Sequence, residues 1–322
     1  MTIMEKYTKI ALPIDQQIEL LKERGLDIPD ADRTARHLSN ISYYRMSAYM
    51  IPFRKPNPDG SLSNDFIPGT SWNDINGLYR FDRKLRLLVF DAIERIEIAL
   101  RTKLIYQLSL KYGSHWQNEA SIFLPPRTNG KTGKTMDVYA DIQRHIKEQL
   151  TANRKVTFIE HYLSKYDDPP TPPSWMSIEL LYFSELSKIC QNLKSRKDRT
   201  DIAKAFGVID DRTFCSWLHT LNYLRNICAH HARLWNISLD ISPVKYTNKD
   251  SGKVWLTNEE VNMAQSKKLY YTLCIILYLL QSVNPNHHFR EQFNLLLQKY
   301  PIANVAYMGF PKNWQEHALW KI

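Results

Sequence analysis

The feature that most constrains the fold of this chain is its longest periodic run, "YRFDRKLRLLVFDAIERIEIALRTKLIYQLSLKYG", residues 79–113. Apolar residues recur in it at spacings of three and four, as they do along one face of an α-helix. Other stretches with helical periodicity are 13–24, 31–53 (broken near Ser39–Ser42), 137–165, 175–194, 197–206, 210–230 and 258–283. No stretch alternates convincingly as a strand does, although the turn-rich segment 54–70 could hold a short hairpin. The sequence therefore predicts an all-α protein.

The charge balance indicates what kind of partner such a protein would bind. Basic residues exceed acidic ones by 43 to 33, which gives a formal net charge of +10. An excess of this size favours a polyanionic partner, but it also occurs in basic proteins that have none. The first residues lack the apolar run of a signal peptide, and the apolar segment 269–283 is too short to cross a bilayer comfortably. We expect that segment to lie in the core of a soluble, cytoplasmic protein.

Several kinds of site are disfavoured by the spacing of the residues that would build them. The four cysteines lie far apart without a CxxC pair, so we expect reduced core thiols. His287 and His288 are adjacent, diverge on a helix and have no third ligand nearby. The loop "PPRTNGKTGKT" (125–135) lacks the glycine spacing of a phosphate-binding loop. The sequence therefore predicts no metal and no cofactor.

One short stretch, "TLNYLRNICAHHARLWN" (220–236), gathers polar residues on an otherwise apolar helix. Asn226 and His230 are four apart and share one side of that helix, where an amide can orient an imidazole. Arg225 would point roughly 140° away from His230 on a regular helix. A complete site would then require the helix to fray near Ala229 or a second copy of the chain to supply the missing group, and we favour the dimer.

These residue types suit the cleavage of RNA. RNA carries its own nucleophile, the 2′-hydroxyl, whose proton a histidine can accept while an arginine neutralises charge that gathers on the phosphorus centre. The alternative is structural: Arg225 would pair with a carboxylate and His230 would cap the end of a helix. The spacing alone does not decide between them, because Arg212 and His219 form a similar pair just upstream.

A resemblance favours the catalytic interpretation. "LRNICAHH" resembles the signature of HEPN ribonuclease domains. In that signature a polar residue follows an arginine, and four to six residues separate the arginine from a histidine. The chain also resembles the AbiD/AbiF-like family of bacterial abortive-infection proteins along nearly its full length. The blocks that carry this resemblance are 41–53, 81–104, 173–189, 221–236 and the closing "GFPKNW…ALW" (309–320).

The resemblance implies a HEPN-type toxin of phage defence, a metal-independent endoribonuclease whose site is shared by two copies of the motif. Arg225 and His230 match the invariant pair of that motif, and Asn226 matches the polar position. His231 also stands at an allowed spacing, so either histidine could be catalytic. The resemblance further implies an RNA partner, a homodimer, no membrane association and, as for some relatives, restraint by a small noncoding RNA.

The expected organisation is a HEPN-type helical bundle with two additions. Residues 1–70 would form an N-terminal helical region and 71–322 the bundle. Residues 113–170 would form a helical insertion with a basic loop, placed to clamp RNA. Trp217 and Trp235 are expected in the core or at an interface. Trp175 and Glu179 would anchor the bundle, or Glu179 would orient a catalytic arginine.

Candidate RNA contacts are basic or aromatic residues on loops and polar helix faces. Those in the block "SYYRMSAYMIPFR" could instead be core residues, because tyrosines at helical spacing usually pack inside. The set is Tyr44, Arg45, Arg54, Arg83, Lys84, Arg127, Lys131 and Lys134.

Two other classes of function compete with the nuclease. The chain could be a structured-RNA-binding module of a defence ribonucleoprotein, with a latent or absent nuclease activity. It could also be a sensor or adaptor that acts through protein contacts. RNA that copurifies with the protein would favour the first of these and argue against the second.

Overall fold

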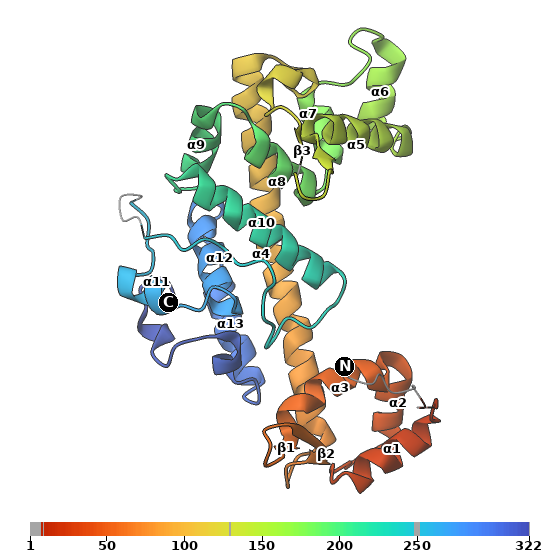
Figure 1. Cartoon of the computed structure of the whole chain (residues 1–322). Coiled ribbons are helices and arrows are strands. Elements are labelled where there is room, and N and C mark those ends of the chain that lie inside the picture. Colours follow the sequence, from red (N-terminus) through yellow and green to blue (C-terminus); the bar gives the residue numbers. More distant parts are fainter. Residues whose placement is uncertain (1–7, 9, 129, 248–251, 322) are drawn as a thin grey trace. The chain divides into compact units, whose positions relative to one another are not determined.

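The computed structural model describes residues 8, 10–128, 130–247 and 252–321, and helices dominate it (Figure 1). These described residues form thirteen α-helices and two small two-stranded sheets, which confirms the all-α prediction. The chain divides into two compact units. The first takes its described residues from Met1–Leu85 and Leu295–Asn304, and the second takes them from Arg86–Asn294 and Val305–Ile322.

The first unit contains the N-terminal helices. Its elements are α1 (Ile14–Glu23), α2 (Ala31–Ile41), α3 (Tyr43–Met50), β1 (Arg54–Pro56), β2 (Leu62–Phe66) and the beginning of α4 (Trp72–Tyr112). The carboxylate of Asp30 accepts a hydrogen bond from the Arg33 N–H and so caps α2. Ser42 has a φ of 71° and separates α2 from α3 within the segment where a break was predicted.

The segment 54–70, interpreted from sequence mainly as a loop, contains the short hairpin that was left open as an alternative. Strands β1 and β2 pair antiparallel, with Arg54 opposite Phe66 and Pro56 opposite Leu62. Asp59 accepts hydrogen bonds from the N–H and hydroxyl of Ser61, and Gly60 has a φ of +82°. Local turn chemistry therefore closes the hairpin, although neither strand alternates in hydrophobicity.

The second unit is built on the remainder of α4. Its other helices are α5 (Val138–Ala152), α6 (Thr157–Lys165), α7 (Ser174–Ser177), α8 (Phe183–Asn192), α9 (Arg196–Lys204), α10 (Asp211–Ala229), α11 (Asn258–Met263), α12 (Leu269–Val283) and the first part of α13 (Phe289–Lys299). A minimal hairpin joins β3 (Arg127–Thr128) to β4 (Thr135–Met136). Helix α10 packs against α8, α9 and α12.

Helix α12 forms the centre of the second unit, as predicted for its apolar sequence. Every residue from Leu269 to Leu280 is buried. The chain's last residues pack on it: Tyr270 is hydrogen-bonded to His317 at 2.6 Å, and the indole N–H of Trp320 donates to the Sγ of Cys274. Within the described residues, none of the helices combines the length and apolar character that a membrane crossing requires.

Three stretches predicted as continuous helices are interrupted. The stretch 137–165 divides into α5 and α6, 175–194 divides into α7 and α8, and 258–283 divides into α11 and α12. Apolar periodicity does not report these interruptions. Before α8, the carboxylate of Glu185 accepts from the N–H of Tyr182, which starts a new helix after an extended residue.

The proline cluster 167–173 lies inside the second unit and is a stiff connection rather than a linker between domains. Tyr162 donates to the carbonyl of Pro169, while Gln117 and Ser177 both donate to that of Pro172. These bonds tie the prolines to elements on both sides of them in the sequence.

The three tryptophans whose positions were predicted differ in their burial. Trp217 and Trp235 are fully buried, as predicted. Trp175 is 49% exposed, so the prediction that it anchors the bundle is wrong. It lies in the short helix α7, where Ser174 and Ser177 take the buried positions.

The cysteines are free thiols, as predicted. The sulfur atoms of Cys190 and Cys215 lie 4.0 Å apart, on α8 and α10. The interaction with Cys215, together with burial, raises the pKa of the Cys190 thiol well above its usual value. A thiol in this environment is a poor nucleophile.

Candidate functional site at the end of helix α10

Helix α10 carries the polar motif on a firmly packed frame. The Asp210 carboxylate accepts from the N–H of Thr213 at 2.8 Å and caps the first turn. Leu221, Leu224 and Cys228 are buried, and they give the last turns of the helix a packed face as predicted. The polar residues that follow are therefore presented by a rigid element.

The helix ends at the histidine pair by a six-residue turn of the Schellman type. The N–H of His231 donates to the carbonyl of Cys228 at 3.1 Å, and the N–H of Ala232 donates to that of Ile227 at 3.0 Å. His231 has a φ of 56°, in the left-handed region that glycine usually occupies at this position. His230 is the residue just before it and closes the helix.

Asn226 and His230 are both exposed on this end of the helix. The carbonyl of Asn226 accepts from the N–H of His230 at 2.9 Å, as in a regular helix. Among the described residues no hydrogen bond joins the two side chains. The amide therefore lies on the same side as the imidazole, but in this structure it does not hold the ring.

Arg225 faces a different environment. Its side chain is half-buried, its Cζ lies 5.6 Å from the centre of the Phe90 ring on α4, and its Nε is buried without a hydrogen-bond partner. Within the described residues it forms no ion pair, contrary to the structural alternative in which it binds a carboxylate. It lines a pocket of about 410 Å³, whose other walls are Phe90, Glu94, Glu97, Ile98, Arg101 and Glu179.

The helix does not fray before the motif ends. Helix α10 remains regular to Ala229, so Arg225 and His230 of one copy diverge by roughly 140°. The first of the two routes to a complete site, a frayed helix near Ala229, is therefore absent. The two groups can meet at one phosphate only if two copies of the motif combine or the turn rearranges.

A buried arginine holds the pocket's acidic wall in place. Arg101 is only 9% exposed and pairs with Glu97 at 3.1 Å, and it donates to the carbonyl of Leu181 at 2.9 Å. Its Nε lies 3.9 Å from Glu179. Glu179, predicted either to anchor the bundle or to orient a catalytic arginine, lines the Arg225 pocket and lies close to Arg101.

A second buried arginine supports the turn itself. Arg86 on α4 is 4% exposed, and its Nη1 donates to the carbonyl of Ala232 at 3.2 Å. Sequence analysis did not single out Arg86, Phe90, Glu94 or Glu97. The only available signal was that α4 alternates charges with apolar residues, and that pattern does not distinguish buried charges from solvated ones.

The predicted RNA contacts fall into two groups that belong to different units. Tyr44, Arg45, Arg54, Arg83 and Lys84 lie in the first unit. Tyr44 is 89% exposed, which disfavours the core alternative for this residue, whereas Tyr49 nearby is buried. Arg54 is half-buried. The motif itself belongs to the second unit.

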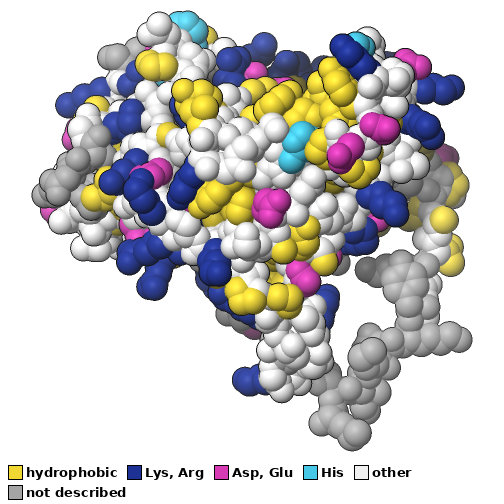
Figure 2. Space-filling view, turned by 90° about the horizontal axis from the view of Figure 1, so that it is seen from above, with side chains coloured by type: hydrophobic (Ala, Val, Ile, Leu, Met, Phe, Trp, Pro, Cys, Tyr) yellow, Lys and Arg dark blue, Asp and Glu magenta, His cyan; other side chains and the backbone are white. Residues whose placement is uncertain are grey.

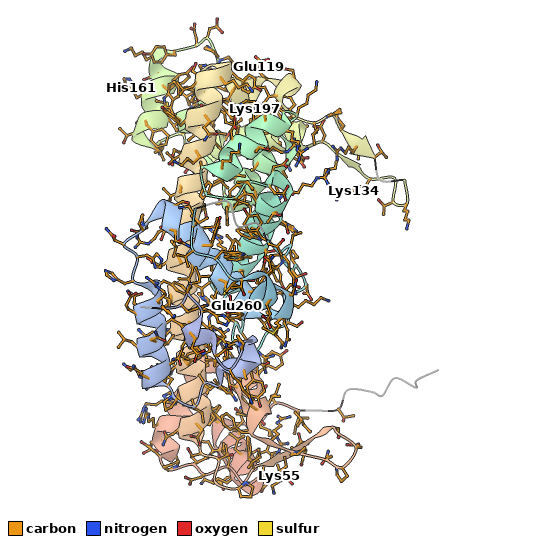
Figure 3. All side chains as sticks on the ribbon, turned by 90° about the vertical axis from the view of Figure 1, so that its left-hand side faces the viewer. Lys55, Glu119, Lys134, His161, Lys197 and Glu260 are labelled. Carbon is orange, nitrogen blue, oxygen red and sulfur yellow. The ribbon has the colours of Figure 1, made fainter. Side chains whose placement is uncertain are left out.

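Arg127, Lys131 and Lys134 lie in the second unit on the β3–β4 hairpin and are all exposed. Figure 3 shows Lys134 on this hairpin, which extends away from the neighbouring helices. Elsewhere, on the face drawn in Figure 2, lysines and arginines are scattered among acidic side chains rather than joined in one stripe.

No group of three or more His, Cys, Asp or Glu side chains within the described residues could hold a metal ion. His287 and His288 line a small pocket of about 110 Å³. Burial, with a contribution from Arg290, lowers the pKa of His287.

A comparison with protein-family models places these elements in a family. The model for Abi-like proteins matches residues 36–236, from α2 to the end of the histidine turn. The chain belongs to the Abi-like protein family. This is an abortive-infection family, and the match includes four of the five blocks on which the sequence resemblance rested. The block 309–320 lies outside it. No curated protein and no solved structure matches the chain.

Proposed function

We propose that this Abi-like protein is a HEPN-type, AbiD/AbiF-like endoribonuclease that cleaves RNA without a metal ion during abortive-infection defence. The proposal depends on one observation, the exposure and pairing of the motif residues. His230 and Asn226 are exposed at the end of α10, and Arg225 lines a pocket without an ion-pair partner among the described residues. The structural alternative requires a carboxylate partner for Arg225, and no such pair is formed among the described residues, although His230 does close the helix as that alternative also expects.

The proposed reaction uses the RNA's own 2′-hydroxyl. Its oxygen attacks the adjacent phosphorus while the proton passes to a histidine, and the bond to the 5′-oxygen breaks as that oxygen gains a proton. His230 serves as acid or base, and the Arg225 guanidinium stabilises the charge that builds on the phosphoryl oxygens. The products carry a 2′,3′-cyclic phosphate and a 5′-hydroxyl.

The divergence of Arg225 and His230 supports a homodimer in which each copy contributes to a shared site. A small noncoding RNA that restrains the enzyme is part of the same proposal. Sequencing of the RNA that copurifies with the protein would identify such a partner. Ribosomal fragments alone would argue against a dedicated one.

The test is cleavage of a labelled RNA in EDTA, with the chemistry of the product ends determined. Arg225→Ala and His230→Ala should lower the rate by about 100-fold or more. Arg212→Ala and His219→Ala are matched controls, because both residues are exposed on the same helix, and they should cleave normally. Activity abolished by the chelator, or unchanged by both motif variants, would contradict the proposal.

The second candidate is an RNA-binding module without nuclease activity, which the exposed basic hairpin favours. In that case Arg225→Ala and His230→Ala would leave both RNA affinity and toxicity intact. Neutralising Arg127, Lys131 and Lys134 would remove binding. The two candidates therefore differ in which set of variants has an effect.

A further inference from the structure

The Arg225 pocket has the size and the wall chemistry of a ligand site. Its volume of about 410 Å³ lies in the range typical of small-molecule sites, and it combines apolar walls with a few polar groups. The walls come from three places in the second unit: the middle of α4, the short turn at Glu179 and the motif helix α10. All three contain residues within the matched family region.

One wall of the pocket is a flat cation. The Arg225 Cζ lies 5.6 Å from the centre of the Phe90 ring, so an aromatic side chain supports the guanidinium through a cation–π contact. Guanidinium planes stack on flat π systems, and RNA-binding proteins use them as platforms for unpaired bases. Among the described residues, the buried Nε of Arg225 has no hydrogen-bond partner and the side chain forms no ion pair, so the contact with Phe90 is what holds the group.

The other wall accepts hydrogen bonds. Arg101 fixes Glu97 in an ion pair and lies close to Glu179, and its own Nε is buried without a hydrogen-bond partner. Glu94 differs from both of these glutamates, because its exposed carboxylate has no hydrogen-bond or ion-pair partner among the described residues. An ionised carboxylate only accepts hydrogen bonds, so a ligand that contacts Glu94 in place of water must donate.

We propose that this pocket binds a guanine base of the RNA substrate, which makes it a specificity site. The base stacks on Arg225, and its N1–H and N2 amino group donate to the carboxylate of Glu94. Adenine and cytosine each present one amino donor beside an acceptor that would face the carboxylate, and uracil presents one donor between two acceptors. Guanine alone offers two adjacent donors. The inference rests on the proposed function for its RNA substrate.

Binding can be measured without cleavage. We expect guanosine to bind the purified protein more tightly than adenosine, cytidine or uridine in calorimetric titrations. Inosine is the matched ligand, because it lacks only the N2 amino group, and it should bind about tenfold more weakly than guanosine, the scale of a bidentate base contact. Glu94→Gln should reduce this difference to about twofold or less, since an amide cannot accept both donors.

Glu160→Gln is the matched variant, because Glu160 is an exposed glutamate on α6 outside the pocket, and it should keep the full preference. Equal affinity for guanosine and inosine in the unaltered protein would overturn the proposal. So would a preference that survives Glu94→Gln, or a pocket that takes the cationic ligand spermidine but no nucleoside.

Cleavage mapping separates this inference from the proposed function. If RNA is cut with no base preference and Glu94→Gln leaves the pattern unchanged, the guanine site is wrong and the nuclease stands. If guanosine binds in a Glu94-dependent way and no RNA is cut, the nuclease is wrong and the base site stands. Cleavage next to guanine that shifts in Glu94→Gln supports both.

Discussion

At the scale of single residues, the two adjacent histidines have different backbones and should be separable. His230 has ordinary backbone angles at the end of α10, whereas His231 occupies the left-handed region at a position that favours glycine. A residue with a Cβ pays a conformational cost there that glycine does not. The strained residue is thus also the alternative candidate for catalysis.

We expect His231→Gly to raise the free energy of unfolding by about 1 kcal/mol and to leave RNA cleavage within about twofold. Urea denaturation and a cleavage assay measure the two quantities. His231→Ala is the control, because it removes the same imidazole and keeps the Cβ. If both variants lose cleavage, His231 and not His230 is the catalytic histidine.

Arg86 should be a stabilising residue of the turn. We expect Arg86→Ala to lower the free energy of unfolding by about 2 kcal/mol, because it removes a charge-assisted hydrogen bond to Ala232 from a buried site. Arg95→Ala on the same helix is the comparison, since Arg95 is exposed and pairs only with Asp91 across one helical turn. Its loss should cost under about 0.5 kcal/mol. If chemical denaturation gave equal losses of unfolding free energy for the two variants, the Arg86 contact with Ala232 would contribute no more than an exposed ion pair.

The environment of Arg225 could not be predicted at this scale. The resemblance of the block around them to the HEPN signature points to Arg225, Asn226 and His230, and the structure leaves Asn226 and His230 exposed. The partners of Arg225 lie on α4 and near Glu179, distant in the sequence. Local patterns carry no information about such contacts, because folding brings them together only through tertiary packing.

At the scale of elements, periodicity located most helices and missed their interruptions. Helices such as α1, α4 and α10 have apolar repeats together with clear start and stop residues. The break before α8 is accompanied by a single capping contact, that of Glu185 with the N–H of Tyr182. An apolar repeat continues across such a break, so periodicity alone joins the two helices.

Helix α2 should make the first unit sensitive to mild acid. The indole N–H of Trp72 donates to Nδ1 of His37 at 3.1 Å. Burial, with Arg33, Arg36 and Arg80 nearby, lowers the pKa of His37 below its usual 6.5. The unfolded chain then binds the proton more readily than the folded chain does. The contribution to stability is complete above pH 6.5 and is lost as the pH falls below it.

We therefore expect the free energy of unfolding to decrease between pH 7.5 and pH 5.5, as measured by urea denaturation followed through tryptophan fluorescence. His37→Gln can still accept from Trp72 but does not titrate, so it should show a flatter pH dependence. An identical decrease in the variant would assign the acid sensitivity to other groups.

At the scale of the whole molecule, the chain divides into two compact units at a point that the sequence does not mark. The compact units separate at Leu85–Arg86, inside the continuous helix α4, and the first unit also takes Leu295–Asn304 from near the other end. In a sequence, proline, glycine and capping residues mark the ends of helices. A division inside a helix leaves no proline or glycine to mark it, so composition cannot reveal it.

The net charge of +10 bears on RNA affinity at the same scale. If the β3–β4 hairpin contacts RNA phosphates, replacing Arg127, Lys131 and Lys134 with glutamine should reduce the slope of log Kd against log salt concentration by about 2, as expected for three single-strand contacts. Fluorescence anisotropy with a labelled RNA measures the slope. Glutamine at Lys188, Lys204 and Lys312, which are exposed elsewhere, should change it less. Equal effects of the two triple variants would show that RNA affinity depends on the net charge and not on the position of these residues in the hairpin.

The packing of Tyr270 with His317, and of Cys274 with Trp320, also has a practical consequence for work with this protein. Helix α12 and residues 305–321 both lie past the matched family region, so a gene fragment trimmed to that region would omit the centre of the second unit. The face of α10 that packs against α12 would then meet water, and we would expect insoluble material from such a fragment. An affinity tag is better fused at the amino end, where it would leave the packing of residues 305–321 on α12 undisturbed.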